Sequence, residues 1–168
     1  EKENILPLLD EILESFKYYE LELIVIDDNS KDGTSSLVRE HAKKNRIIRP
    51  INRIGRSGLS SAIKEGCLNA TGEIIAIMDT DGQHEVSAMT NAIEKLLNSR
   101  LDLIAGSRFL HESSIQGLSQ KREGFSILAN SLARLSLSKK YSQLTDFMSG
   151  CIVLKRQSCI SIIEKVDV

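Results

Sequence analysis

Two carboxylates spaced one residue apart follow an apolar segment in the middle of the chain. The segment runs Glu73-Ile-Ile-Ala-Ile-Met78, and Asp79 and Asp81 come after it, with Gln83 and His84 close behind. Residues i and i+2 of an extended chain point to the same side, so both carboxylates can bind one divalent cation. Mg²⁺ and Mn²⁺ prefer such hard oxygen ligands. The spacing therefore indicates a metal site that could clamp a phosphorylated substrate.

Acidic residues also end an earlier apolar segment. Residues 21–26 form a short run rich in leucine and isoleucine, and Asp27 and Asp28 follow it directly. A carboxylate at the end of a strand can accept hydrogen bonds from a nucleobase N–H or from ribose hydroxyls. Contact with a nucleotide is therefore the functional role that we expect for Asp28.

Basic residues in the second half of the chain could hold another phosphate. Arg108 follows the apolar segment 102–106, and Arg122 and Ser126 lie beyond a polar loop at 110–120. A guanidinium group matches phosphate oxygens in a bidentate fork. If the loop folds back, the two arginines and the serine would form a second phosphate pocket.

Each of these groups also has a structural interpretation. Asp79 and Asp81 could form a solvated acidic turn, and Asp28 could close a turn before a helix, as we expect of Asp32. Arg108 could be an ordinary partner in a surface ion pair. His84 lies at the expected site, but its role as ligand, hydrogen-bond donor or structural residue stays open.

Apolar periodicity predicts the elements that must position these residues. We expect a helix over residues 5–16, with Asn4 as the cap, and further helices over residues 35–44, 86–99 and 122–137. Another helix should follow the loop that holds Gly55 and Gly58 and end at Asn69. Strands are expected over residues 21–26, 46–49, 73–78, 102–106 and 150–154. Turn formers between Asp27 and Thr34 separate the first strand from the helix that follows it.

Alternating strands and helices of this length favour a mainly parallel, doubly wound α/β sheet, because parallel strands need crossover helices. Ligands of such sheets bind at the carboxyl ends of the strands. Asp28, Asp79 with Asp81, and Arg108 each follow a strand, so we expect all three groups to converge on one rim.

Composition limits the class of protein. The 168 residues are 41% hydrophobic, which suits a single globular domain over residues 1–168, and the net charge of −1 gives no reason to expect nucleic acid as a partner. Three cysteines without C-x-x-C spacing indicate neither a disulfide framework nor a zinc site, and they fit a reducing cytoplasm. No apolar run approaches the roughly 20 residues of a transmembrane helix. The chain starts without Met in a helical pattern, so we expect a domain truncated at both ends.

Six motifs in order give a more specific indication. They are Ile24-Val-Ile-Asp-Asp-Asn-Ser-Lys-Asp-Gly-Thr34, Gly58-Leu59 with Ala62, Ala70-Thr-Gly-Glu73, Met78-Asp-Thr-Asp-Gly-Gln-His84, Gly106-Ser-Arg-Phe109 and Asp146-Phe-Met-Ser-Gly150. Together they resemble the family 2 glycosyltransferases, and most of all the dolichol-phosphate mannosyltransferase branch. The resemblance covers nearly the whole chain.

The resemblance implies a GT-A fold that transfers a sugar with inversion, typically mannose from GDP-mannose, to a polyprenyl or dolichyl phosphate in a membrane. The enzyme would act at the cytoplasmic face as a peripheral protein. A phosphate monoester is largely dianionic at neutral pH, so this acceptor needs positioning more than it needs a general base. Mg²⁺ or Mn²⁺ would neutralise the leaving diphosphate.

Roles for individual residues follow from the same resemblance. Asp28 would bind the base or ribose of the nucleotide sugar. Asp79 and Asp81 would form the Asp-x-Asp metal and diphosphate site, with Gln83 as a further metal ligand. The acceptor phosphate would be held by Arg108, Arg122 and Ser126.

The sequence departs from the family pattern at several places. The family's first strand, with a Pro-x-Tyr-Asn-Glu stretch that helps to bind the nucleotide, is missing here and would lie just before Glu1. Gly82 and Glu85 stand where an apolar residue and a proline are usual, which would loosen the metal loop. Cys151 stands where an aromatic residue usually follows Ser-Gly.

Other functions remain as alternatives. A related transferase could use UDP-glucose or another nucleotide sugar, because the motifs encode donor choice poorly. An acidic pair at a strand end also occurs in phosphoacceptor modules that resemble response-regulator receivers, but this alternative leaves Asp79, Asp81 and the arginines without a role. A non-catalytic binding subunit is the third alternative, and metal-dependent turnover separates it from an enzyme.

Overall fold

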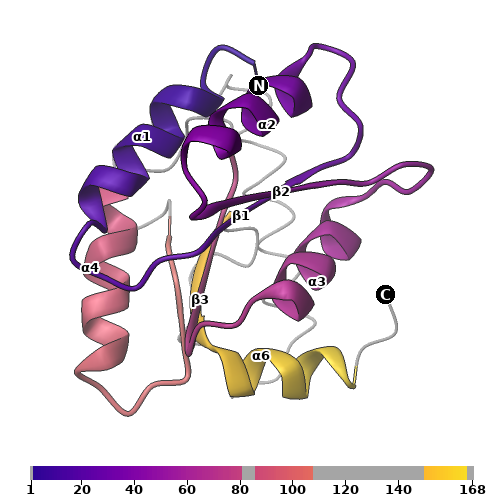
Figure 1. Ribbon diagram of the computed structural model, residues 1–168. Helices are drawn as coiled ribbons and strands as arrows, with labels where there is room; N and C mark the ends of the chain where they lie inside the picture. The colour runs from indigo at the N-terminus through magenta and orange to yellow at the C-terminus, as the bar shows by residue number, and fades with distance from the viewer. Residues whose placement is uncertain (1, 81–85, 108–149, 166–168) are drawn as a thin grey trace, which may run out of the picture.

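The β-strands in the described part of the chain form two small sheets that helices cover on both sides (Figure 1). A computed structural model describes residues 2–80, 86–107 and 150–165. Within them the chain runs through α1 (Ile5–Ser15), β1 (Leu23–Asp27), α2 (Thr34–Lys44), β2 (Ile48–Asn52), α3 (Leu59–Asn69), β3 (Ile74–Met78), α4 (Val86–Leu97), β4 (Leu103–Ala105), β5 (Cys151–Lys155) and α6 (Arg156–Ile163). The predicted alternation of helices and strands is confirmed.

Strand direction is parallel in one sheet and mixed in the other. β1 and β2 pair in parallel, with Asp27 opposite Asn52 at their carboxyl ends. In the other sheet, β5 lies between β3 and β4 and runs antiparallel to both. β3 and β4 therefore point the same way, and β5 runs against them.

Alternate residues of β5 show that both faces of its sheet are buried. Cys151 and Val153 belong to a cluster with residues of α1 and α4, whereas Leu154 packs with Cys67 of α3 and Cys159 of α6. Successive side chains of a strand point to opposite faces. The sheet is thus covered by α1 and α4 on one face and by α3 and α6 on the other, as expected of a doubly wound fold (Figure 1).

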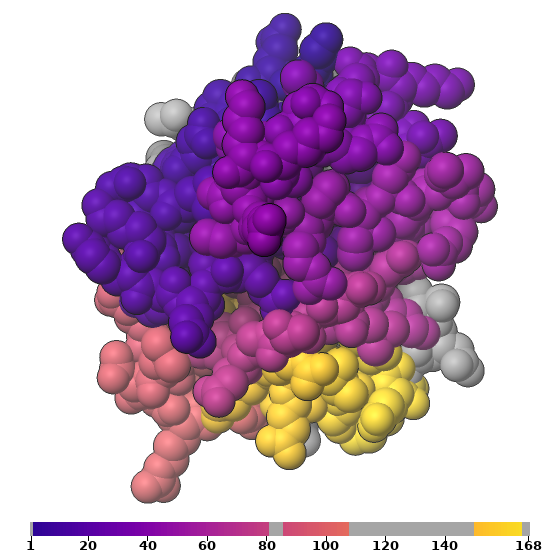
Figure 2. Space-filling model, viewed as in Figure 1, coloured from indigo at the N-terminus to yellow at the C-terminus, as the bar shows by residue number. Residues whose placement is uncertain are grey.

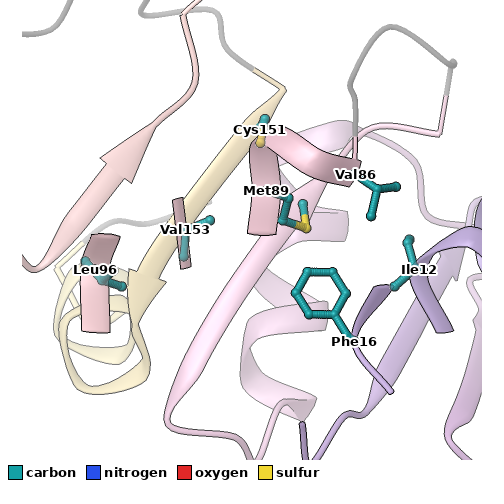
Figure 3. Packing of buried hydrophobic residues seen from close by; sticks show 7 residues of the cluster. All are labelled: Ile12, Phe16, Val86, Met89, Leu96, Cys151 and Val153. Atoms are coloured by element: carbon teal, nitrogen blue, oxygen red, sulfur yellow. The ribbon is translucent and has the colours of Figure 1, made fainter. Parts of the chain in front are cut away.

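Side chains of the first of these clusters interlock between α1, α4 and β5. Figure 3 shows Phe16 beside Met89, with Val86 and Ile12 close by. A third cluster joins α1 and α2 to the first sheet through Leu9, Val38 and Ile48. On the face shown in Figure 2, residues 2–80 form the upper part and α4 and α6 the lower part. The helices thus fix the strands from several sides.

Two expectations about local structure need correction. The second strand spans Ile48–Asn52 rather than residues 46–49, because the Asn45 side chain accepts a hydrogen bond from the Ile47 N–H and keeps the chain in a turn up to that point. Asn4 precedes α1, but its side chain makes no cap hydrogen bond. The predicted helix at 122–137 and the loop at 110–120 lie outside the described residues.

One carboxylate ties the start of β1 to the turn before β3. Glu22 accepts hydrogen bonds from the Thr71 hydroxyl at 2.8 Å and the Gly72 N–H at 2.9 Å, and Arg49 pairs with its other oxygen at 2.8 Å. Burial raises the pKa of the Glu22 carboxyl, but the hydrogen bonds from Thr71, Gly72 and Arg49 outweigh burial and hold the pKa below its ordinary value. The charged form therefore stabilises the fold.

This pKa shift predicts how stability changes with pH. Because the pKa of Glu22 is lower in the folded protein than the ordinary 4.5, its contribution is present above pH 4.5 and is lost as pH falls through the folded pKa. We expect Glu22→Gln to lower the free energy of unfolding by about 1–3 kcal/mol at neutral pH. The difference from wild type should shrink as the solution is acidified, which urea unfolding at a series of pH values measures. Glu20→Gln, at an exposed neighbour, is the matched control, and an equal loss there would contradict the role of Glu22.

Candidate active site

The loops after β3 and β4 meet at the start of β5. The backbone N–H of Asp79 donates to the carbonyl oxygen of Gly150 at 3.1 Å, and that of Gly106 donates to the carbonyl oxygen of Cys151 at 2.8 Å. The apolar β3 strand ends at Met78, so Asp79 is the first residue beyond it and is partly exposed. The structure therefore places Asp79 at the carboxyl end of a strand, as the sequence predicts.

The charge of Asp79 acts on a buried neighbour. Burial raises the pKa of the Cys151 thiol, and the negative charge of Asp79 raises it further. Cys151 is 5% exposed and stands opposite Met78 in the ladder between β3 and β5. The thiol is thus a packed, protonated group. The position at which the family usually carries an aromatic side chain is filled here by a small buried one.

Several residues expected at the site lie outside the described residues. These are the second carboxylate, its two neighbours and the acceptor-phosphate group: Asp81, Gln83, His84, Arg108, Arg122 and Ser126. Their roles stay predictions. The convergence of all three groups on one rim likewise stays a prediction, although the loops after β3 and β4 do meet at the start of β5.

Asp28 follows the last residue of β1 and is held by two contacts. One carboxylate oxygen accepts a hydrogen bond from the Gly58 N–H at 2.9 Å, and the other lies 3.0 Å from Nε of Arg53. The Asp28 side chain remains 32% exposed. Gly58 is the residue that precedes α3, so the Asp28 carboxylate lies at the amino end of that helix, where the helix dipole favours negative charge.

Backbone geometry explains why a glycine, Gly58, ends the connection between β2 and α3, which protrudes from the fold (Figure 1). Gly58 has φ 119° and ψ 135°, a conformation that residues with a side chain rarely adopt. This conformation directs its N–H to Asp28. The glycine thereby joins the loop after β1 to the start of α3.

The turn after β1 forms as its residues predict. The Asp27 carboxylate accepts a hydrogen bond from the Ser30 N–H at 2.9 Å, and Asp32 accepts one from the Thr34 N–H at 2.9 Å. The hydrogen bond from Thr34 holds the pKa of Asp32 well below its ordinary value. The turn-forming role expected of Asp32 is therefore confirmed, whereas Asp28 contacts the connection before α3.

Sequence patterns do not single out Arg53, although the structure gives it a central place beside Asp28. Its side chain is 1% exposed, which is unusual for arginine. Its Nη2 donates to the Ser61 hydroxyl at 2.8 Å, and its Nε lies 3.8 Å from Glu65. The only signal in the sequence is a charged residue directly after the strand Ile48–Asn52.

The described residues can supply part of a divalent-metal site. Asp79 offers a hard oxygen ligand at the end of β3, which suits Mg²⁺ or Mn²⁺. Within residues 2–80, 86–107 and 150–165, no three histidine, cysteine or acidic residues gather as a metal-binding group. A site of the Asp-x-Asp type would draw its other ligands from Asp81 and Gln83, so the part that is described fits such a site.

Comparison with known proteins gives the site a context. The sequence model of glycosyl transferase family 2 matches residues 1–163. A dolichol-phosphate mannosyltransferase of Pyrococcus furiosus is 29% identical over 157 residues, which are 94% of this chain and 44% of that protein. A dolichyl-phosphate beta-glucosyltransferase of Trichomonas vaginalis is 34% identical over 110 residues, which are 61% of this chain and 34% of that protein.

The fold is also found in a solved structure. It is a mannosyltransferase from Pyrobaculum calidifontis in complex with GDP-Man and Mn²⁺, with a TM-score of 0.56 and 22% sequence identity. The similarity covers 95% of this chain and 44% of that one, and it confirms the GT-A type of α/β fold expected from the sequence. The chain spans less than half the length of each of these three proteins.

Proposed function

This chain belongs to glycosyl transferase family 2, and from that premise we propose that it is the catalytic domain, or part of it, of an enzyme that transfers a sugar from a nucleotide donor to a polyprenyl or dolichyl phosphate. The observation that carries the proposal is the position of Asp79. It is the first carboxylate of an Asp-x-Asp motif, and it lies at the carboxyl end of β3 in a domain that the family matches over residues 1–163.

The chemistry of the proposed reaction fits these residues. Asp79, Asp81 and Gln83 would hold Mg²⁺ or Mn²⁺, which neutralises the diphosphate of the leaving nucleotide. Asp28 would bind the base or ribose, and its partly exposed carboxylate keeps acceptor capacity beyond its two contacts. The acceptor phosphate carries its own negative charge as nucleophile, so positioning and charge neutralisation supply most of the catalysis, with inversion at the sugar carbon.

Mannose from GDP-mannose is the donor that we propose. The Gly106-Ser-Arg-Phe109 motif favours the mannosyl branch, and the Pyrococcus relative is named a mannosyltransferase. The Trichomonas relative supports UDP-glucose as the second candidate, because it is named a glucosyltransferase.

The acceptor would place the enzyme at a membrane. We propose a peripheral position at the cytoplasmic face, where a polyprenyl phosphate presents its head group. No helix in the described ranges is long and apolar enough to cross a bilayer.

A transfer assay on the full-length protein tests the proposal. Labelled GDP-mannose and UDP-glucose are offered separately with a polyprenyl phosphate, in the presence of Mn²⁺ or of EDTA. We expect label in the lipid fraction with one donor, only when the metal is present. A folded protein that yields no lipid product from either donor would overturn the proposed reaction.

Arg108 provides a test of the acceptor side. If it binds the acceptor phosphate, Arg108→Ala should raise the acceptor KM about 10- to 100-fold, since a hydrogen bond to a charged group contributes about 1.5–3 kcal/mol. The Kd for the donor nucleotide should change much less. Steady-state kinetics and nucleotide titration separate the two effects. Arg100→Ala, at an exposed arginine before β4, is the matched control, and equal weakening of donor and acceptor by Arg108→Ala would contradict the assigned role.

A further inference from the structure

A buried arginine stands directly behind the carboxylate to which we assign nucleotide binding. Arg53 follows β2, and its backbone N–H donates to the carbonyl oxygen of Asp27 at 2.8 Å, which continues the pairing of β1 and β2 by one residue. Its side chain is 1% exposed and lies 3.0 Å from Asp28 through Nε. Arg53 therefore contacts the end of β1 through both its backbone and its guanidinium group.

The guanidinium group also reaches the first turns of α3. Nη2 donates to the Ser61 hydroxyl at 2.8 Å, and that hydroxyl donates to the Gly58 carbonyl oxygen at 3.0 Å. Glu65 lies 3.8 Å from Nε and pairs with the exposed Arg56 at 3.2 Å. A single side chain thus joins the loop after β1, the connection before α3 and α3 itself.

Charge balance makes this burial tolerable. A guanidinium taken out of water costs several kcal/mol unless opposite charges and hydrogen bonds compensate. The positive charges of Arg53 and Arg56 face the negative charges of Asp28 and Glu65. Nε and Nη1 of Arg53 nevertheless make no aligned hydrogen bond within the described part of the chain. The contact with Asp28 is therefore a close ion pair rather than a well-directed hydrogen bond.

The two contacts of Asp28 leave its carboxylate oriented but not saturated. An ionised carboxylate has about four acceptor sites, and Gly58 and Arg53 occupy one side of each oxygen. The side chain keeps 32% of its surface exposed. A purely structural carboxylate would need no exposed surface, whereas one that binds a ligand needs both a fixed orientation and free lone pairs.

We propose that Arg53 is a positioning residue for nucleotide binding: it holds the Asp28 carboxylate in the orientation in which that carboxylate meets the nucleotide, and it fixes the start of α3 to the same point. The proposal rests on the nucleotide-binding role of Asp28 in the proposed function. Arg53 itself, being buried, does not touch the nucleotide. Its effect passes through Asp28.

A double-mutant cycle on nucleotide affinity tests this coupling. The full-length protein is titrated with GDP, and separately with UDP, in the presence of Mn²⁺ by calorimetry, for wild type, Arg53→Gln, Asp28→Asn and the double variant. Loss of a residue that orients a ligand-binding group costs about 10- to 100-fold in affinity at metal sites, and we expect each single variant to raise Kd about tenfold. Because Arg53 acts through Asp28, the double variant should bind no more weakly than Asp28→Asn alone.

Arg49 is the matched structural control. It lies in β2 and pairs with Glu22 at 2.8 Å, at the opposite end of the β1–β2 pair from Asp28. Arg49→Gln should lower the midpoint of urea unfolding without changing Kd. Arg53→Lys is the second variant in case Arg53→Gln does not fold. It keeps the charge but cannot span Asp28 and Ser61 together, so we expect an intermediate Kd.

The outcomes test the positioning role of Arg53 separately from the nucleotide-binding role of Asp28. If folded Arg53→Gln or Arg53→Lys binds nucleotide as wild type does while Asp28→Asn binds weakly, the positioning role of Arg53 is wrong and the role of Asp28 stands. Additive losses in the double variant would also overturn the positioning role. If Asp28→Asn binds normally, or if wild type binds neither nucleotide, the assigned function of Asp28 fails and the positioning role fails with it.

Discussion

Asp79→Asn is expected to reduce the rate of sugar transfer by about 10²- to 10³-fold, the usual loss when one preorganised electrostatic group is removed from a transition state. The substitution keeps the size of the side chain and leaves the backbone hydrogen bond from residue 79 to Gly150 in place. It removes a negative charge from the position at which the metal and diphosphate would bind. Asp81→Ala, which removes the second carboxylate of the motif, should abolish transfer while leaving the fold largely intact.

A lipid-transfer assay over a range of Mn²⁺ concentrations checks this result. If the lost charge is a metal ligand, more Mn²⁺ should restore part of the rate of Asp79→Asn. The matched control is Asp102→Asn, which removes an exposed carboxylate paired with Lys155 at 2.9 Å at the other end of the same sheet. Normal turnover by folded Asp79→Asn and Asp81→Ala proteins would remove the basis for a metal-dependent transferase.

Phe16→Ala is expected to give the largest loss of stability. Phe16 follows α1, is 4% exposed and packs in the cluster that joins α1 to α4 and β5 (Figure 3). Its ring also meets the Tyr19 ring edge-to-face, with the centroids 5.7 Å apart. Truncating a buried phenylalanine costs about 3–5 kcal/mol through lost burial and the cavity that remains. That is a large share of the roughly 5–15 kcal/mol that holds an ordinary domain folded.

Urea unfolding followed by circular dichroism measures this loss as a fall in the transition midpoint. Tyr18→Ala is the matched control, because Tyr18 is an aromatic residue two positions later that is 89% exposed. Its replacement should change the free energy of unfolding by no more than about 0.5 kcal/mol. Similar losses from both substitutions would show that the cluster around Phe16 does not hold α1 in place.

The helices and strands were predictable from the sequence because their signals are local. The apolar run before Asp79 and the turn formers after Asp27 each act within a few residues, and both elements form as expected. The start of β2 was not predictable from β-branched residues alone, because the Asn45 side chain extends the preceding turn. The place of β5 between β3 and β4 depends on pairing between distant segments, for which the local pattern carries no signal.

The residues of the candidate site also differ in whether the sequence alone could identify them. Asp28 and Asp79 were identifiable because each directly follows an apolar strand, and a strand end is where ligands of α/β sheets bind. Arg53 was not, because an arginine is usually exposed and its burial here depends on Asp28, Ser61 and Glu65, which lie on other segments. Sequence patterns find residues that face a ligand more readily than those that hold them in place.

The order of strands in the second sheet has a consequence for how the chain folds during synthesis. β3 and β4 each pair with β5 in the described part of the chain, and β5 is made only after residues 108–149. Pairing across so long a separation is slow, because the entropy cost of closing the intervening loop must be met before the strand pairing contributes stability. The ribosome therefore releases β1 and β2, which can pair early, well before β3 and β4 gain their partner. Until then the edges of β3 and β4 that will pair with β5 are open to strands of other chains. The nascent chain should therefore bind chaperones most strongly in that interval.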